Sequence, residues 1–277
     1  MIQLHATIRE NRNVTPDCRC LILVAPDIAG PAVPGQFVMI RLAGDRPPFL
    51  PRPFSIHRVS PDRSELEILY KVVGPGTRQM AGLQAGDSLN LVGPLGRGFV
   101  VPASARQITL AAGGMGVAPL VFLAETLAGP GRNLTGCQVF IGGCGQNDIL
   151  CRDHFTKLSL PLEITTEDGS CGQAGRVTAP LENHLAEQPP DLVCACGPVP
   201  MLAAVADLAA RRNIPCQVSI ETMMACGIGA CLGCAVRPAG RSDRYFHACQ
   251  DGPVFAADQI DLASLAGPAR TGGGIFS

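Results

Sequence analysis

Alternating apolar and polar residues dominate the first hundred positions of the chain. In residues 2–8 every second side chain is apolar, which is the period of a strand that buries one face. Further short apolar runs follow, separated by glycine and proline, at 18–25, 36–42, 54–59, 65–73 and 88–93. Several short strands at this spacing predict an antiparallel β-barrel or sandwich, with one short helix over 77–83.

The pattern changes after Pro102, where apolar runs begin to alternate with amphipathic stretches. We expect strands at 108–112, 137–143, 162–167, 192–196 and 216–221, and helices at 117–127, 176–187 and 198–213. This alternation predicts a parallel α/β sheet with helices on both faces. From Glu221 a loop rich in cysteine and glycine precedes a short tail. The fold class is therefore multi-domain α+β, with expected divisions at 1–99, 100–219 and 220–277.

Composition narrows the class of protein. Charged residues make up 16% of the chain and hydrophobic residues 47%, which excludes an intrinsically disordered protein. The net charge of −1 gives no reason to expect nucleic acid or an anionic membrane as a partner. Residues 107–124 carry no charge, but their glycines and Pro119 divide them into a strand, a loop and a helix rather than one membrane-spanning helix.

Thirteen cysteines are unusual in such a chain. Their odd number, and an N-terminus unlike a signal peptide, argue against a disulfide framework and predict a reducing, cytoplasmic location. Four of them have the spacing C-x4-C-x2-C-x14-C, which is typical of the plant-type [2Fe–2S] ligand set: Cys226, Cys231, Cys234 and Cys249. A structural zinc site, or unrelated buried thiols, is the alternative. We expect the other cysteines to be mostly small packing residues.

A glycine loop, Gly113, Gly114 and Gly116, stands between a predicted strand and a predicted helix. Such a loop lets a pyrophosphate approach the backbone at a helix N-terminus. Pro119 replaces the last glycine of the usual dinucleotide fingerprint, so a plain tight turn is the alternative.

A second strand-to-helix turn, Cys196-Gly197-Pro198, should lie at the same edge of the sheet. The loop at 142–146 contains no Arg or Lys that could pair with a 2′-phosphate, which favours NADH over NADPH unless another base such as Arg152 serves.

In the first part of the chain, Arg52-Pro53-Phe54-Ser55 places a guanidinium and a hydroxyl three residues apart at a strand entry. An Arg fork suits a pyrophosphate, and a hydroxyl can contact a flavin ring nitrogen. The turn at 74–77 opens the short predicted helix. By spacing alone, these are equally well explained as ordinary turn features.

Together, in this order, the motifs RPFS (52–55), YKVVGPGT (70–77), GGMGVAPL (113–120), CGPVPM (196–201) and the cysteine cluster resemble the ferredoxin–NADP reductase superfamily with an added ferredoxin-like domain. More narrowly, ETMMACGIGACLGC (221–234) and ACQDGPVF (248–255) resemble the electron transfer subunits of dihydroorotate dehydrogenase B. The resemblance spans residues 1 to about 262. It implies an FAD-binding β-barrel, an NAD-binding α/β domain and a C-terminal [2Fe–2S] domain with a tail.

The resemblance also implies roles for particular residues. The FAD contacts would be Arg52, Pro53, Phe54, Ser55, Leu69, Tyr70, Lys71, Gly76 and Thr77. The NAD(H) contacts would be Gly113, Gly114, Gly116, Cys196 and Gly197, and the cluster ligands the four cysteines above. Phe54 stands where relatives often have Tyr, which removes the hydroxyl of one flavin hydrogen bond.

A relay of electrons is the function that the resemblance implies. Electrons would pass between an FMN-containing dihydroorotate dehydrogenase subunit and NAD through [2Fe–2S] and FAD, in a heterotetramer that serves pyrimidine (UMP) synthesis. The five histidines are scattered, and we expect surface or packing roles for them rather than a catalytic one. Two alternatives remain: the NAD(P)H-linked subunit of a sulfhydrogenase or of a ferredoxin:NADP oxidoreductase, and a non-enzymatic iron–sulfur or zinc scaffold.

Overall fold

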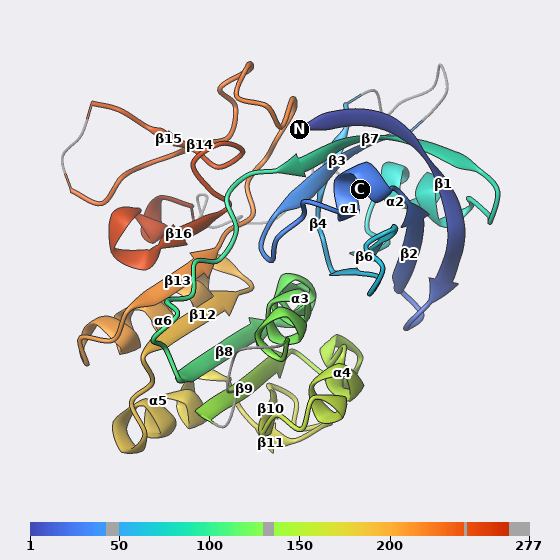
Figure 1. The fold of residues 1–277 in the computed structure, drawn as a ribbon. Helices are drawn as coiled ribbons and strands as arrows, with labels where there is room; N and C mark the ends of the chain where they lie inside the picture. The colour runs from blue at the N-terminus through green and yellow to red at the C-terminus, as the bar shows by residue number, and fades with distance from the viewer. Residues whose placement is uncertain (43–49, 130–135, 241–242, 266–277) are drawn as a thin grey trace, which may run out of the picture.

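A computed structural model describes residues 1–42, 50–129, 136–240 and 243–265. Within these ranges the chain forms two seven-stranded sheets and one two-stranded sheet. The two large sheets lie beside each other, and the segment with the two-stranded sheet lies next to both (Figure 1).

The first sheet is antiparallel and curved into a half-barrel, in the strand order β4-β3-β7-β1-β2-β6-β5 (Figure 1). Its strands are β1 (Ile2–Asn13), β2 (Cys18–Val24), β3 (Phe37–Arg41), β4 (Arg52–Ser55), β5 (Arg58–Val59), β6 (Glu65–Lys71) and β7 (Ser88–Leu95), with helices α1 (Pro26–Ala29) and α2 (Pro75–Ala81). The predicted antiparallel β structure is confirmed. The strand expected at 54–59 is two strands, because Ile56 and His57 leave the ladder between β4 and β5.

The second sheet has the order β11-β10-β9-β8-β12-β13-β16 and is parallel except for its last strand. Its strands are β8 (Gln107–Gly113), β9 (Gly136–Gly143), β10 (Leu162–Thr166), β11 (Gln173–Ala174), β12 (Leu192–Cys196), β13 (Cys216–Ser219) and β16 (Val254–Ala256). Its helices are α3 (Val117–Leu127), α4 (Arg152–Lys157), α5 (Thr178–Glu187) and α6 (Val199–Ala210). The predicted parallel α/β sheet is confirmed, and β16 adds an antiparallel edge that the alternation does not predict.

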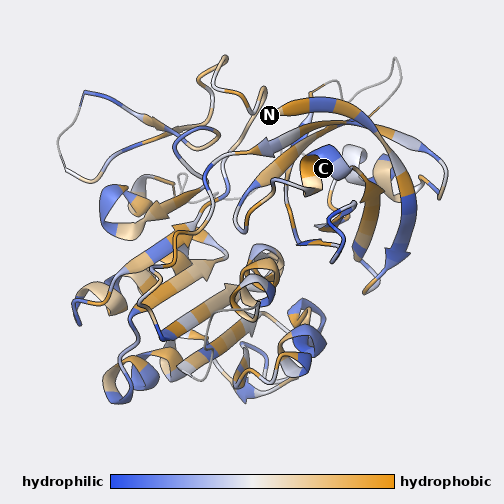
Figure 2. Cartoon of the chain, in the orientation of Figure 1, coloured by the Kyte–Doolittle hydropathy of each residue, from blue (hydrophilic) through white to orange (hydrophobic). Residues whose placement is uncertain are grey.

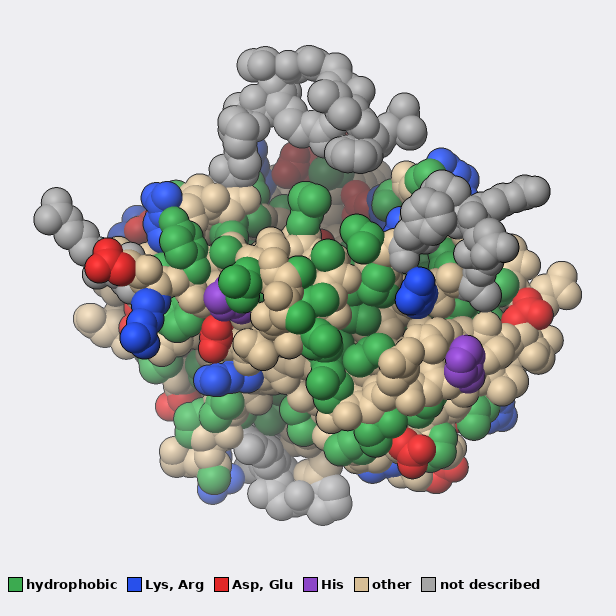
Figure 3. Space-filling view, turned by 90° about the horizontal axis from the view of Figure 1, so that it is seen from above, with side chains coloured by type: hydrophobic (Ala, Val, Ile, Leu, Met, Phe, Trp, Pro, Cys, Tyr) green, Lys and Arg blue, Asp and Glu red, His purple; other side chains and the backbone are tan. Residues whose placement is uncertain are grey.

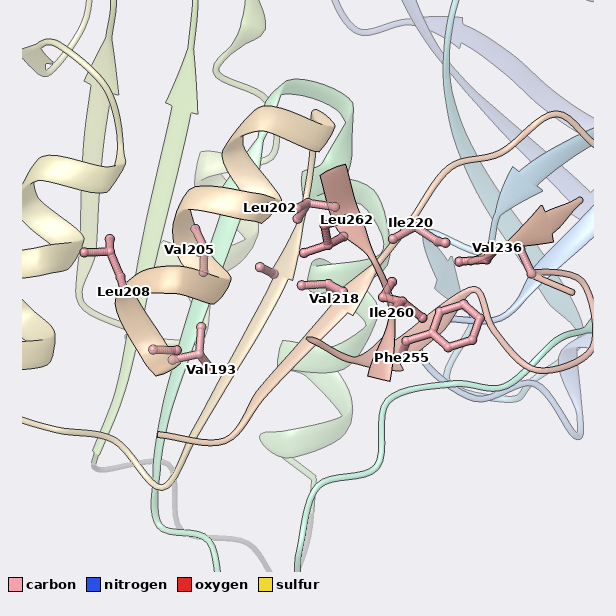
Figure 4. Close-up of a cluster of buried hydrophobic side chains, with 14 of the residues drawn as sticks. Val193, Leu202, Val205, Leu208, Val218, Ile220, Val236, Phe255, Ile260 and Leu262 are labelled. Atoms are coloured by element: carbon pink, nitrogen blue, oxygen red, sulfur yellow. The ribbon is translucent and has the colours of Figure 1, made fainter. Parts of the chain in front are cut away.

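Helices cover both faces of the second sheet, and alternate residues of each strand point to opposite faces. Val193 and Ala195 of β12 pack with α5 and α6, whereas Cys194 and Cys196 pack with α3 on the other face. Figure 4 shows the first of these clusters, to which α6, β12, β13 and the C-terminal segment all contribute. The strands are accordingly hydrophobic while the outer sides of α4 and α5 are hydrophilic (Figure 2). Each fully buried Leu or Val contributes about 1.5–3 kcal/mol to folding.

Helix α3 joins the two large sheets. Phe122 of α3 is buried in the core of the first sheet, and Leu69 of β6 is buried in a core of the second. The sheets therefore share apolar contacts along one boundary, and the site described below lies at that boundary.

The uncharged stretch 107–124 folds as predicted, into β8, a 3-10 turn at Gly114–Gly116 and the start of α3. In the described ranges, the molecule contains no helix long and apolar enough to cross a membrane.

After β13 the chain forms the cysteine-rich loop, then β14 (Ala235–Val236) and β15 (Phe246–His247), which pair with each other. It returns to the second sheet as β16 and ends in two 3-10 turns, Ala257–Gln259 and Leu262–Leu265. Leu262 packs into the same core as α6, which fixes the end of the described chain to the second sheet.

Candidate functional site

A cavity of about 870 Å³ lies at the carboxyl ends of the parallel strands. Loops after β8, β9, β10, β12 and β13 form most of its wall, and Cys18 and Lys71 of the first sheet close one side. This is the edge at which open α/β sheets bind ligands, and the volume is within the range of small-molecule pockets.

The glycine loop forms the middle of the cavity wall, and close packing explains why these positions need glycine. A Cβ on Gly116 would come within 2.1 Å of the Cys196 carbonyl oxygen, and one on Gly113 within 2.5 Å of the Met201 sulfur. Gly114 differs, since its φ of +51° favours glycine and no atom crowds it. Its backbone is therefore open to a ligand, at the start of a helix whose N–H groups attract anions.

The Cys196-Gly197 turn packs directly on this loop. A Cβ on Gly197 would lie 3.0 Å from Gly113 Cα, so the two turns touch backbone to backbone. Cys196 is buried just behind the wall, and burial raises the pKa of its thiol to about 12, with Glu221 adding to the effect. The thiol is therefore neutral and acts as a packing group at physiological pH.

Two charged residues that sequence reasoning missed stand at the outer end of the cavity. Glu167 follows β10 and Arg176 follows β11, and the Glu167 Oε1 and Arg176 Nε atoms are 3.8 Å apart. Arg176, rather than Arg152, is the Arg in the cavity wall. The position of Glu167 directly after a predicted strand was the available signal, because an acid at a strand end can bind a ribose hydroxyl.

Lys71 connects the two large sheets at the mouth of the cavity. Its Nζ lies 3.0 Å from Asp17 Oδ2 and 3.4 Å from Asp148 Oδ1, and these carboxylates raise the pKa of the ammonium group. Asp148 belongs to the 3-10 turn Gln146–Asp148, which follows β9. An ion pair thus spans the boundary beside the site.

The RPFS motif forms β4 and lies outside the wall of this cavity. The guanidinium of Arg52 rests on the start of α2, where a Cβ on Gly76 would come within 2.6 Å of Arg52 Cζ. Thr77 Oγ1 accepts hydrogen bonds from the backbone N–H groups of Val73 and Gly74. Among the described residues Arg52 has no carboxylate partner, so its charge is available to an anion.

Leu69 and Tyr70 are buried, unlike Arg52 and Ser55, which are half-buried. Tyr70 Oη donates to Asn11 Oδ1 at 3.0 Å, and its ring meets the edge of Phe54 with centroids 6.1 Å apart. Tyr70 therefore supports β4 from behind.

The four cluster cysteines lie on the loop after β13 and on the segment that returns from β15. Cys234 and Cys249 are buried with their sulfur atoms 3.2 Å apart. In the loop, the backbone N–H groups of Ile228 and Cys231 each point at Cys226 Sγ, at 3.4 Å. Burial raises the pKa of the Cys226 thiol, but these donors outweigh it and bring the pKa down to about 7. The loop thus stabilises a thiolate.

Loop conformation makes these contacts possible. Gly227, Gly229 and Leu232 have positive φ values, which turn successive N–H groups inward. Within the ranges the structure describes, no group of three or more His, Cys, Asp or Glu side chains forms a ready site for a single metal ion. The spacing of the four cysteines and the N–H donors at Cys226 Sγ suit a two-iron cluster, in which each iron takes two protein ligands.

Family models match two parts of the chain. The iron–sulfur cluster binding domain of dihydroorotate dehydrogenase B matches residues 221–261, and the oxidoreductase NAD-binding domain matches residues 110–207. The first range contains all four cluster cysteines, and the second contains both glycine turns.

Whole-chain relatives agree with these matches. The chain is 39% identical, over 89% of its length and 94% of the relative, to the dihydroorotate dehydrogenase B (NAD(+)) electron transfer subunit of Desulforamulus reducens. It is 38% identical to the same-named protein of Clostridium acetobutylicum, over 83% of this chain and 86% of that one.

Solved structures share the fold. A chain of the NADH-dependent reduced ferredoxin-NADP oxidoreductase superimposes with a TM-score of 0.82 at 26% identity, over 94% of this chain and 91% of that chain. A ferredoxin NADP+ reductase from Neisseria gonorrhoeae, with bound FAD and NADP, has a TM-score of 0.64 at 18% identity, covering 76% and 92%. The second likeness is evidence of fold alone.

Proposed function

We propose a function from the premise that this chain belongs to the family of dihydroorotate dehydrogenase B electron transfer subunits. As a member it is an oxidoreductase subunit that passes electrons between NAD and a catalytic subunit in pyrimidine synthesis. One observation carries the proposal: the cysteine loop follows β13 directly from the cavity, and its Gly227 packs against Met39 of β3, the strand paired with RPFS. This packing supports an arrangement in which the three proposed cofactor sites adjoin one another.

In this proposal each cofactor has a defined place. The cavity takes NAD(H), with Gly113, Gly114 and Gly116 at the pyrophosphate and Gly197 in front of the buried Cys196. FAD takes the outer side of β4, where Arg52 pairs with its pyrophosphate and Ser55 reaches the ring. Pro53, Phe54, Leu69, Tyr70, Lys71, Gly76 and Thr77 complete that site. Cys226, Cys231, Cys234 and Cys249 hold the [2Fe–2S] cluster.

When bound, FAD exchanges a hydride with NAD and single electrons with the cluster, which is chemistry that protein side chains cannot supply. The residues of the chain bind and orient. The Arg52 guanidinium has no carboxylate partner among the described residues and can bind a diphosphate, although its Nη1 donates to the Leu50 carbonyl oxygen. The backbone at Gly114 is open to a second diphosphate. Tyr70 excludes water behind β4, and Cys196 does so behind the Gly197 turn. Leu69 points to the opposite face of β6 and is buried against the second sheet.

The partner follows from the same premise. The relatives are electron transfer subunits by name, and we propose an FMN-containing dihydroorotate dehydrogenase as the catalytic subunit, in a cytoplasmic heterotetramer. Met223 and Leu232, beside the cluster cysteines, are 86% and 59% exposed. Hydrophobic side chains also gather on the upper face of the molecule, seen in Figure 3. Exposed apolar groups beside the electron exit suit a docking surface.

We also propose that the chain has three functional parts, with an FAD-binding part at 1–99, an NAD-binding part at 100–219 and a cluster-binding part at 220–277. The second candidate function is a subunit of a ferredoxin:NADP oxidoreductase or sulfhydrogenase. It is favoured by the TM-score of 0.82 to the NADH-dependent reduced ferredoxin-NADP oxidoreductase.

Co-purification with each candidate partner, followed by turnover, separates the two functions. For the proposed function we expect flavin and [2Fe–2S] absorbance in the complex, and NAD reduction by dihydroorotate only when the FMN subunit is present. NADPH formation from NADH and reduced ferredoxin would instead establish the second candidate. A purified chain without flavin would contradict both and would support a scaffold.

A further inference from the structure

Glu221 is an unpaired carboxylate at one end of the cavity. It lies two residues after β13 and forms part of the cavity wall. Within the described ranges it makes no ion pair or hydrogen bond, and burial alone raises its pKa. The residue is exposed on the wall of an open cavity and has no partner there, so its carboxylate is available to a ligand.

The position of Glu221 along the cavity can be defined by strand order. The glycine loop after β8 is in the middle, between β9 and β12. Glu167 and Arg176, after β10 and β11, form one end of the cavity, and Glu221 after β13 forms the other. A dinucleotide whose pyrophosphate lies on the glycine loop therefore places one nucleoside at each end.

The end that holds Glu221 is the one next to the proposed flavin site, so the next step rests on the proposed function. Six residues beyond Glu221, Gly227 packs against the Met39 side chain, and Met39 is the register partner of Pro53 in β4. Hydride exchange requires the nicotinamide to lie next to the flavin. The nicotinamide half of NAD accordingly belongs at the Glu221 end, and the adenosine half at the Glu167 end.

We propose that the Glu221 carboxylate makes the cavity bind the oxidised nicotinamide of NAD⁺ more tightly than the reduced ring of NADH. The oxidised ring carries one positive charge and the reduced ring carries none. A carboxylate a few ångströms away attracts the first and is indifferent to the second. The rest of each dinucleotide is the same, so it contributes equally to both affinities.

The surroundings of Glu221 leave this attraction uncompensated. The neighbouring Cys196 thiol is neutral, because burial, with a smaller contribution from Glu221, raises its pKa to about 12. Glu167 at the other end is already paired with Arg176. The consequence for a subunit that reduces NAD⁺ is that its substrate binds well and its product leaves.

The experiment is a binding titration of the flavin-loaded, oxidised protein with two probes. NAD⁺ carries the charged ring, and 1,4,5,6-tetrahydro-NAD carries a neutral ring that donates no hydride. Opposite charges at 4–6 Å change the relative free energies of charged and neutral forms by tenfold or more. We therefore expect Glu221→Gln to weaken NAD⁺ binding about tenfold relative to tetrahydro-NAD, which is about 1.4 kcal/mol.

Two further variants define the result. Glu167→Gln removes a carboxylate from the adenosine end, and it should change both affinities by the same factor. Glu221→Asp keeps the charge and should keep most of the preference for NAD⁺. It also preserves the test if Glu221→Gln fails to fold, as judged by flavin content and thermal unfolding, because an Asp variant without any preference would then overturn the proposal.

The outcomes separate this inference from the proposed function. If Glu221→Gln weakens both probes equally, or neither, the charge preference is wrong while the NAD site stands. If the wild-type protein binds neither probe, the NAD function itself fails and the inference fails with it.

Discussion

His57 is a titratable side chain that is only 2% exposed. It lies between β4 and β5, and its Nδ1 is 3.0 Å from the carbonyl oxygen of Ala118 in α3. Its Nε2 faces Cys151 Sγ at 3.9 Å, and the His154 ring meets its edge. Burial lowers the pKa of His57 to about 4, so the neutral ring donates from Nδ1 across the boundary between the sheets.

Stability should therefore fall as the pH falls from about 6.5 to about 4. The unfolded state binds a proton near pH 6.5, whereas folded His57 does not until about pH 4. The contribution is complete above pH 6.5 and decreases through this window by about 3 kcal/mol in total. Denaturant unfolding of the apoprotein at several pH values measures this loss of stability.

The control is His57→Phe, which keeps the ring volume and removes the titration. We expect this variant to be less stable at pH 7.5, because the hydrogen bond to Ala118 is lost, but to have a shallower pH dependence. An unchanged slope of stability against pH between 6.5 and 4.5 would show that His57 is not the source of the effect.

A substitution at Gly116 tests the contact between the Gly113–Gly116 loop and the Cys196-Gly197 turn. In Gly116→Ala the new methyl would lie 2.1 Å from the Cys196 carbonyl oxygen, so the turns must separate. We expect a loss of about 3 kcal/mol in stability and weaker NAD⁺ binding. Gly74→Ala is the matched control, because no atom lies within 4 Å of its Cβ and its φ is −151°. Thermal unfolding and NAD⁺ titration measure the stability and the NAD⁺ affinity of both variants. Equal losses in Gly116→Ala and Gly74→Ala would contradict a specific role for the contact at Gly116.

At the scale of elements, the cysteine loop makes a direct test possible. Cys231→Ser should reduce iron, acid-labile sulfide and cluster absorbance to a small fraction of the wild-type values, because a cluster iron loses a thiolate. Cys144→Ser is the control, since Cys144 is also exposed but lies outside the loop. Full cluster absorbance in Cys231→Ser would show that the ligand assignment is wrong.

Elements with clear periodicity were predicted from the sequence, and those without it were not. Strand β1 continues to Asn13, beyond the predicted end at Ile8, because its polar second half still pairs with β2 although it has no alternation. Helices α1 and α4 have four and six residues, too few for a helical period to be recognised. The predicted helix at 77–83 begins two residues earlier, at Pro75.

At the scale of the whole molecule, Arg58 holds the large sheets together. Its guanidinium is 2.7 Å from Glu125 of α3 and 2.9 Å from Glu67 of β6. Glu125→Gln keeps the size of the side chain and removes one charge, and we expect a loss of about 1–2 kcal/mol. Glu10→Gln is the control, because its pair with Arg12 is solvent-exposed at 3.7 Å. Thermal unfolding compares them, and an equal loss in both variants would refute this role for Arg58.

The glycine and cysteine motifs of the candidate site could be recognised from the sequence, because each has a fixed local spacing. The residues at the two ends of the cavity could not be recognised from the sequence. Glu167, Arg176 and Glu221 come from three separate strand ends, and only the strand order of the sheet brings them to one cavity. His57 looked like any scattered histidine, since its burial depends on α3, which begins sixty residues later.

The antiparallel strand β16 has a consequence for the topology of the chain. The chain leaves the second sheet after Ser219 and re-enters it at Val254, and these two residues are register partners. The cysteines therefore lie on a closed loop whose two ends are joined by adjacent strands. A closed loop has far fewer conformations than a free tail, so the separation between nucleotide and cluster varies little. A peptide bond broken inside that loop would leave two fragments that remain associated through β13 and β16.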